Sequence, residues 1–257
     1  MIHHEIYGGR HHWFVFGRDP DKLGHIIDTN QYLVCDRGAN FLLDPGGIET
    51  FSSMLPAVAA RCDIAEVKYL FASHQDPDII SSLGLWDKAI PHAKLYAPWL
   101  WEGFLKHFGC HNIEYVGIPD EGMTLDLPSV KLQFVPAHYL HSSGNYHVYD
   151  PVAKILMSGD VGAALEPPGA PMFVDDFAEH VPKMELFHRR WMPSNRAKND
   201  WIARVRQLDI DVMAPQHGRL FRGDDVKRFL DWFEALEVGI AIPREDEPEA
   251  LDEQEAA

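Results

Sequence analysis

The feature that most constrains this chain is an apolar run that leads straight into metal-ligand side chains. Val67–Ala72 is rich in the β-branched and aromatic residues that suit a buried strand. Pro77 does not suit the continuation of that strand, so the run ends in a loop. This loop carries His74, Asp76 and Asp78. One imidazole and two carboxylates on a single loop indicate a metal site that other parts of the chain would complete.

Three later segments repeat this arrangement of an apolar strand followed by a ligand-type side chain. They are His141 after Val130–Val135, Asp160 after Ile155–Met157, and His217 after Val212–Ala214. Because each candidate follows the end of a strand, we expect the four loops to meet at one edge of the sheets.

The candidate ligands are three imidazoles and three carboxylates: His74, Asp76, Asp78, His141, Asp160 and His217. Six ligands exceed the four of a closed tetrahedral site and suit two metal ions, with one carboxylate bridging them. Imidazole combined with several hard carboxylates favours iron or manganese, whereas a cysteine-rich set would favour zinc.

Other polar side chains close to these loops are candidates for supporting roles. His138 competes with His141 as a ligand, and we favour His141 because Ser142–Gly144 follows it and allows a tight loop. His138 would then fix a ligand through a hydrogen bond. Tyr146, His188 and Asn195 are weaker candidates for the same role, and a packing or surface position is favoured for each.

Composition bounds the partners and the compartment. The chain has 257 residues, 46% of them hydrophobic, and a formal net charge of −16, which argues against nucleic-acid binding. Seven of its acidic residues lie in the segment 244–257, which is typical of a disordered tail; residues 1–243 are expected to form one di-metal domain.

The termini and cysteines favour a cytoplasmic protein with reduced thiols. Cys35, Cys62 and Cys110 are too far apart in the sequence for a CxxC pair, and the first residues lack the features of a signal peptide. No apolar run approaches the roughly 20 residues that span a bilayer, so we expect no membrane insertion.

The pattern along the chain mixes short strands with a few helices. Strands are expected at 13–16, 32–35, 41–43, 67–72, 94–97, 113–116, 130–135, 146–149, 155–157 and 212–214. Apolar residues at helical spacing predict helices over 51–62 and 226–236, and 99–108 and 200–208 are further candidates. Met172–Pro193 is expected to be a long loop or helix that caps the site. Two packed sheets covered by outer helices accommodate this order, although other α/β layouts remain open.

These motifs resemble those of the metallo-β-lactamase superfamily over nearly the whole chain apart from the acidic tail. The family signature H-x-[HED]-x-D is similar to His74, Asp76 and Asp78, and its later elements resemble His141–Asn145, Gly159–Asp160 and His217–Gly218. An early strand end of the family is similar to Leu42–Gly47, with Asp44 near the site and not a ligand. The resemblance implies an α/β fold arranged as a four-layered αββα sandwich.

Two positions place the resemblance in the flavodiiron branch, and it is closest to the stand-alone oxygen-binding di-iron proteins. Asp76 stands where zinc hydrolases usually have His, and Ile79 stands where the dizinc enzymes have a further His ligand. The branch implies one iron held by His74, Asp76 and His141, another held by Asp78 and His217, and Asp160 as the bridge. Family members usually have Glu at the position of Asp76.

The resemblance also implies a homodimer and a di-iron centre that binds or reduces O2, or NO. We expect no FMN-binding domain in this chain, because it ends shortly after its last helix; electrons would come from a separate reductase, or a sensed state would pass to a signalling partner. The alternative is a hydrolase of the same fold with two zinc ions, acting on an ester, thioester, lactone or phosphodiester. A third possibility is a regulatory binding module with structural metals.

Overall fold

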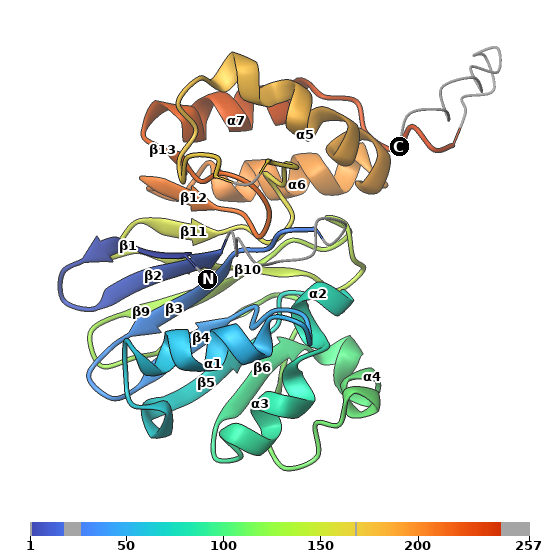
Figure 1. Cartoon of the computed structure of the whole chain (residues 1–257). Helices are drawn as coiled ribbons and strands as arrows, with labels where there is room; N and C mark the ends of the chain where they lie inside the picture. The colour runs from blue at the N-terminus through green and yellow to red at the C-terminus, as the bar shows by residue number, and fades with distance from the viewer. Residues whose placement is uncertain (1, 18–26, 168, 243–257) are drawn as a thin grey trace.

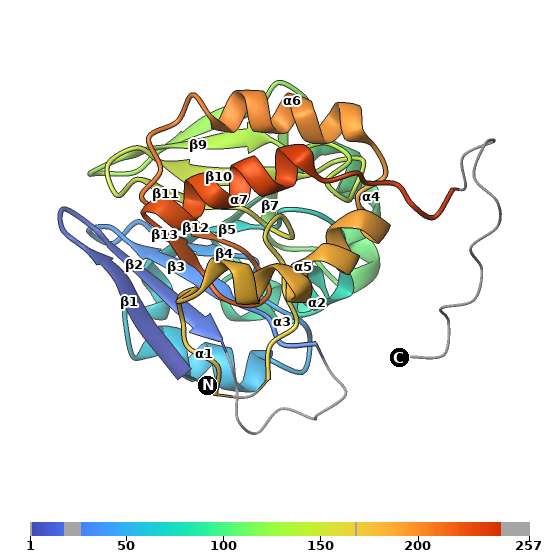
Figure 2. The same ribbon diagram turned by 90° about the horizontal axis from the view of Figure 1, so that it is seen from above.

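Two β-sheets pack face to face, and helices cover the outer face of each sheet (Figures 1 and 2). The structure is a computed structural model and describes residues 2–17, 27–167 and 169–242. The predicted acidic tail, 244–257, lies outside the described residues. The arrangement confirms the predicted αββα sandwich. Among the described residues, no helix combines the length and the apolar character needed to cross a membrane.

The first sheet has the strand order β1-β2-β3-β4-β5-β6-β7. Its strands are β1 (Ile2–Gly8), β2 (His12–Gly17), β3 (Gln31–Cys35), β4 (Asn40–Leu43), β5 (Val67–Phe71), β6 (Lys94–Pro98) and β7 (Glu114–Ile118). The second sheet has the order β13-β12-β11-β10-β9-β8. Its strands are β8 (Met123–Asp126), β9 (Lys131–Pro136), β10 (Tyr146–Asp150), β11 (Ile155–Met157), β12 (Val212–Ala214) and β13 (Phe221–Arg222).

The helices divide between the two outer faces. With the first sheet lie α1 (Phe51–Ala59), α2 (Pro77–Ile80), α3 (Leu83–Ala89) and α4 (Glu102–Leu105), and the short 3-10 segments η1 (Ile64–Glu66), η2 (Trp99–Trp101) and η3 (Lys106–Phe108). The second sheet is covered by α5 (Phe177–Trp191), α6 (Asn195–Val205) and α7 (Asp224–Ala235).

Alternation along the strands explains why both faces of a sheet are buried. In β2, Trp13 and Val15 pack into the core between the sheets, whereas Phe14 and Phe16 pack into the core beneath the first set of helices. Successive strand side chains point to opposite faces, so an unbroken apolar run is what a strand covered on both sides requires. A third core lies between the second sheet and α5, α6 and α7.

The ten predicted strands are confirmed, with ends that differ by two residues at most. The helices predicted over 51–62 and 226–236 are confirmed as α1 and α7, and α6 begins five residues before the predicted start at Asp200. The segment 99–108, a further helix candidate, is helical throughout, but only α4 is an α-helix and the 3-10 segments η2 and η3 flank it. The strands β1, β8 and β13 and the helices α2 and α3 were not predicted.

The candidate ligand loops follow strands that run in parallel pairs. β4 is parallel to β5 in the first sheet, and β11 is parallel to β12 in the second. Parallel neighbours place their carboxyl ends at the same edge of a sheet, so the loops after β5, β11 and β12 open toward one region between the two sheets.

Candidate metal centre

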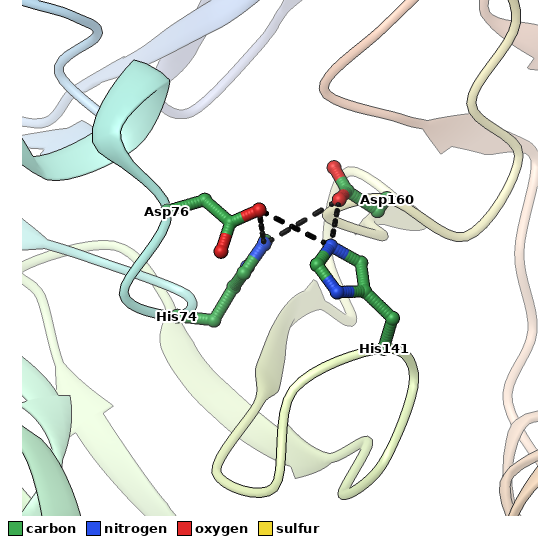
Figure 3. Close-up of side chains that lie close together, drawn as sticks. All are labelled: His74, Asp76, His141 and Asp160. Atoms are coloured by element: carbon green, nitrogen blue, oxygen red, sulfur yellow. Dashed lines mark hydrogen bonds and ion pairs between the residues drawn. The ribbon is translucent and has the colours of Figure 1, made fainter. Parts of the chain in front are cut away.

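Four of the six predicted ligands form one tight cluster between the sheets. Figure 3 shows His74, Asp76, His141 and Asp160 pointing toward a common centre, with one ligand atom of each within 4.8 Å of the others. Nε2 of His141 lies 2.7 Å from Oδ2 of Asp160 and 3.3 Å from Oδ2 of Asp76. Nε2 of His74 lies 3.4 Å from the same oxygen of Asp160 and 3.8 Å from that of Asp76.

The other two predicted ligands meet on the far side of the same aspartate. Nε2 of His217 lies 3.3 Å from Oδ2 of Asp78 and 3.4 Å from Oδ1 of Asp160. The two carboxylate oxygens of Asp160 therefore face different groups: one faces His74 and His141, and the other faces His217. A carboxylate in this position is arranged to bridge two ions.

Local structure aims the two aspartates of the first loop. Asp76 is the N-cap residue of α2, has extended backbone dihedral angles and makes no side-chain capping bond, so its carboxylate is left for the cluster. Pro77 follows at the first helical position, where its fixed φ angle suits a helix start. Asp78 lies in the first turn of α2, and Nε2 of Gln216 approaches its Oδ2 at 3.4 Å.

His217 and His74 are each oriented by a contact that their Nδ1 makes with a neighbouring group. Nδ1 of His217 lies 2.9 Å from the carbonyl oxygen of Asp28, so Nδ1 carries the proton and Nε2 is left for the cluster. Nδ1 of His74 lies 2.9 Å from Oγ of Ser73, whose hydroxyl donates to Oδ2 of Asp44 at 2.8 Å. The backbone N–H of Ser73 donates to Oδ1 of the same aspartate at 2.8 Å.

The carboxylates dominate the electrostatics of the cluster. Burial opposes protonation of the three histidines, but Asp160 and its neighbours outweigh burial: the pKa of His141 rises to about 9, that of His217 to about 10, and that of His74 well above its ordinary value. Burial likewise raises the pKa of Asp44, to about 7. Metal ligation requires neutral imidazoles, so ions bound here would displace protons.

The donor set fits two metal ions. Nε2 of His74 and Oδ1 of Asp160 are buried, and neither makes a hydrogen bond to a described residue. Buried polar atoms normally have a partner, and a bound metal ion would supply one to each of these two atoms. Three nitrogen and three hard oxygen donors match non-haem iron better than a closed zinc site.

The four residues considered for supporting roles lie in different settings. Nε2 of His138 contacts the carbonyl oxygen of Asp120, and Tyr146 donates its hydroxyl proton to the carbonyl oxygen of Pro119 at 2.8 Å. Asn195 bonds to Glu237 and Val238, which is a packing role. None of these hydrogen bonds reaches a candidate ligand, whereas His188 bonds to the loop that carries Asp160.

His188 contacts the loop that carries Asp160. Its Nε2 accepts the backbone N–H of Gly162 at 2.9 Å, and its Nδ1 donates to the carbonyl oxygen of Met184 at 2.8 Å. Burial lowers the pKa of His188 to about 4, so it holds the loop as a neutral ring.

One supporting contact is not predicted by the sequence, and two aromatic rings border the cluster where a capping segment is expected. Ser73 links Asp44 to His74, and nothing in a serine before a histidine indicates such a link in advance. The rings of Trp191 and Phe187, on α5, meet the His141 ring edge to face at centroid distances of 5.3 and 6.1 Å. Helix α5 thus lies over this side of the cluster, as expected of a capping segment at Met172–Pro193.

Comparison with known proteins gives consistent matches. The model of the family described as ODP family beta lactamase matches residues 27–218. A structure of the chemotaxis sensor ODP from T. denticola in its apo state is 36% identical, covers 93% of this chain and 96% of its own, and superposes with a TM-score of 0.84. A structure described as the peroxy diiron species of the chemotaxis sensor ODP is also 36% identical, with 93% and 97% coverage and a TM-score of 0.82.

Two more distant matches are a flavodiiron structure that shares the fold and a relative matched by sequence. The flavodiiron protein from Giardia intestinalis is 19% identical, with 88% of this chain and 57% of that chain covered and a TM-score of 0.77. An uncharacterized protein of Methanocaldococcus jannaschii is 22% identical over 225 residues, and this chain spans about half the length of that relative. The family model covers most of the chain, and identity to the sensor structures exceeds a third over nearly its full length; the chain therefore belongs to the ODP family of beta-lactamase-fold proteins.

Proposed function

We propose that this chain is a non-haem di-iron protein that binds O2 and acts as an oxygen sensor. The observation that carries the proposal is the placement of Asp160, with one carboxylate oxygen toward His74 and His141 and the other toward His217. The 36% identity to the chemotaxis sensor ODP, whose structures include a peroxy diiron species, supports the choice of iron and of O2.

The six residues would divide between two ions. His74, Asp76 and His141 would hold one iron, Asp78 and His217 the other, and Asp160 would bridge them. When bound, the pair of ferrous ions supplies two electrons to one ligand molecule. Three carboxylates offset the positive charge that grows on oxidation. The contacts of Nδ1 with Asp28 and Ser73 hold a proton on that nitrogen of His217 and His74, so Nε2 is the nitrogen that would give up its proton to an ion.

The residues around His141 shape access to the centre. Trp191 stacks on Phe187 at a centroid distance of 5.8 Å, and both rings border His141. Trp191 is itself 54% exposed, so it lies between the cluster and the solvent. An apolar border of this kind admits a small neutral gas more readily than a charged substrate.

We favour sensing over turnover. The separate electron donor, the signalling partner, the homodimer and the cytoplasmic location remain predictions.

The test combines elemental analysis of protein expressed with iron and zinc supplied, anaerobic reduction, and exposure to air in a spectrophotometer. We expect two irons per chain, a spectral change in air and no sustained O2 consumption with excess reductant. Stoichiometric zinc with no spectral change would overturn the proposal, and rapid hydrolysis of an ester or lactone would favour the hydrolase. Sustained O2 or NO reduction would identify an oxidoreductase.

A further inference from the structure

The loops that carry Asp160 and His217 run side by side. The backbone N–H of Gln216 donates to the carbonyl oxygen of Gly159 at 2.7 Å. The backbone N–H of Ala164 donates to the carbonyl oxygen of His217 at 3.4 Å. Backbone hydrogen bonds therefore join the two loops next to both ligand residues, so a shift of one loop displaces the other.

Gly218 allows the two loops to approach this closely. Its φ angle is +79°, a conformation that favours glycine. A Cβ at this position would lie 2.8 Å from the carbonyl oxygen of Ala164 and 2.9 Å from the Cβ of the same residue. A larger residue would push the loops apart, so their close contact is a specific feature of this chain.

Glu166 lies where both loops meet helix α5, and its side chain is only 5% exposed. Nε of Arg219, two residues after His217, lies 2.9 Å from Oε1 of Glu166, and Nη2 of the same arginine donates to Oε2 at 3.4 Å. Nζ of Lys183, on α5, donates to Oε2 at 3.0 Å and to Oε1 at 3.3 Å. One buried carboxylate on the Asp160 loop thus joins the His217 loop to α5.

The other groups near Glu166 leave it with two cationic partners. Nδ1 of His180 lies 3.2 Å from Oε1 of Glu166, but burial lowers the pKa of His180 to about 4, so this ring is neutral near pH 7. Asp175 also pairs with Arg219, but it is exposed and lies outside the buried junction. Because loss of either cation leaves buried charge without compensation, the junction favours one arrangement of the two loops and the helix.

Helix α5 contacts the metal centre at two further places. Its His188 accepts the backbone N–H of Gly162 on the Asp160 loop, and the rings of its Phe187 and Trp191 border His141. Contiguous networks of packed and hydrogen-bonded groups carry coupling between sites, so a change in the position of the loops reaches this helix.

We propose that Glu166 is a positioning residue that couples the second metal site, formed by Asp78 and His217 with Asp160, to helix α5. With His217 and Asp160 held by one ion, the spacing of the two loops is fixed, and Glu166 passes that constraint to Lys183. Because linkage is reciprocal, loosening α5 at this junction also weakens binding at the second metal site. The inference rests on the two-metal centre of the proposed function and does not depend on which metal or gas that centre binds.

Anaerobic cobalt(II) titration of the metal-free full-length protein tests the coupling, because cobalt absorption reports each binding step whichever metal is native. Hydrogen exchange of α5 peptides is measured at each step. In wild type we expect two ions per chain, and exchange in α5 that slows by about fivefold or more when the second metal site fills. In Asp78→Asn, which removes a ligand of that site alone, most of the slowing should be absent.

Glu166→Gln keeps the size and one acceptor oxygen of the side chain but removes its charge. The second metal site should bind cobalt about tenfold more weakly, as is typical when a residue that orients a ligand is lost. Affinity at the first site should change by less than about threefold, and metal binding should no longer slow exchange in α5.

Two variants on α5 separate the helix from the loops. Lys183→Met breaks the link to α5 at a partly exposed side chain and keeps the pair of Glu166 with Arg219, so the response in α5 should be lost with a smaller loss of affinity. Glu185→Gln is the matched control, because it breaks the exposed pair with Arg189 on the same helix and should behave as wild type.

The outcomes distinguish this inference from the proposed function. If wild type binds fewer than two ions, the two-metal centre fails and the inference fails with it. If wild type binds two ions, an equal loss of affinity at both sites in Glu166→Gln would show a merely structural role and overturn the inference. Should Glu166→Gln not fold, as judged by circular dichroism, Lys183→Met decides, and an unchanged response of α5 in that variant would refute the coupling.

Discussion

Replacing Ser73 by Ala should weaken metal binding without touching a candidate ligand. The Ser73 side chain is fully buried, and its Oγ lies 2.9 Å from Nδ1 of His74 and 2.8 Å from Oδ2 of Asp44. The hydroxyl proton can go to only one of these atoms. It goes to the aspartate, so Oγ accepts the Nδ1 proton of His74 and leaves the Nε2 lone pair facing the cluster.

The magnitude follows from what the substitution leaves behind. Loss of the hydroxyl removes one partner each from His74 and Asp44, and a buried unsatisfied polar atom costs about 1 to 3 kcal/mol. We expect the free energy of unfolding of the metal-free protein to fall by about 2 to 4 kcal/mol. Because loss of a residue that orients a ligand typically lowers metal affinity 10- to 100-fold, binding should weaken by about 1.4 to 2.7 kcal/mol.

Chelator competition under anaerobic conditions measures the affinity for ferrous iron, and urea unfolding of metal-free protein measures the stability. Ser82→Ala is the matched control, because Ser82 is equally buried and its hydroxyl donates to the carbonyl oxygen of Gly46 at 2.6 Å. That control should lose stability and keep its affinity. Equal iron affinities for wild type and Ser73→Ala, or an equal loss in both variants, would refute the argument that Ser73 orients His74.

The remaining predictions concern pH, the bridge and the first loop. Because the folded-state pKa of His188 is lowered to about 4, the unfolded chain binds the extra proton between pH 6.5 and 4 and stability falls with acidification. In His188→Gln, the side chain can still accept the N–H of Gly162. Between pH 7.5 and 4.5, the free energy of unfolding measured in urea should fall by about 2 to 3 kcal/mol less in this variant than in wild type. An equal fall in both proteins would exclude His188 as the source. Asp160→Asn should reduce bound iron from two per chain to below one by elemental analysis, whereas Asp175→Asn, at an exposed ion pair, should leave it unchanged. Asp76→Glu should keep both irons, because Asp76 makes no helix-capping bond that the longer side chain would break; loss of iron in this variant would show that the shorter arm is required.

The sequence predicts the strands and the meeting of the six candidate ligands for the same reason. Strands buried on both faces need unbroken apolar runs, and the polar residue that ends each run marks where the strand leaves the core. What escapes prediction is short or polar. β13 has two residues, and β1 carries His3, His4 and Glu5 within a strand that pairs with β2 alone.

Contacts between segments that are distant in the sequence are not predicted, for a different reason. Ser73 meets Asp44 across 29 positions, so this pair has no spacing that a local pattern could reveal. The family resemblance predicts that Asp44 lies near the centre, but its partner Ser73 follows only from the parallel pairing of β4 with β5, which sets the end of one strand beside the end of the other.

Helix α5 shows how a functional face can be present in a sequence and still be hidden. Its buried residues His180, Met184 and His188 are four apart, as required of one helical face, yet two of the three are polar and Pro182 interrupts the pattern. The polar members are inward because they have partners there: His188 holds the Asp160 loop through Gly162, and Nδ1 of His180 lies 3.2 Å from Oε1 of Glu166. A hydrophobic count treats such residues as surface. Apolar periodicity therefore does not predict the inward face of α5, which serves the candidate metal centre. Polar contacts on that face replace the apolar packing by which other helices are recognised.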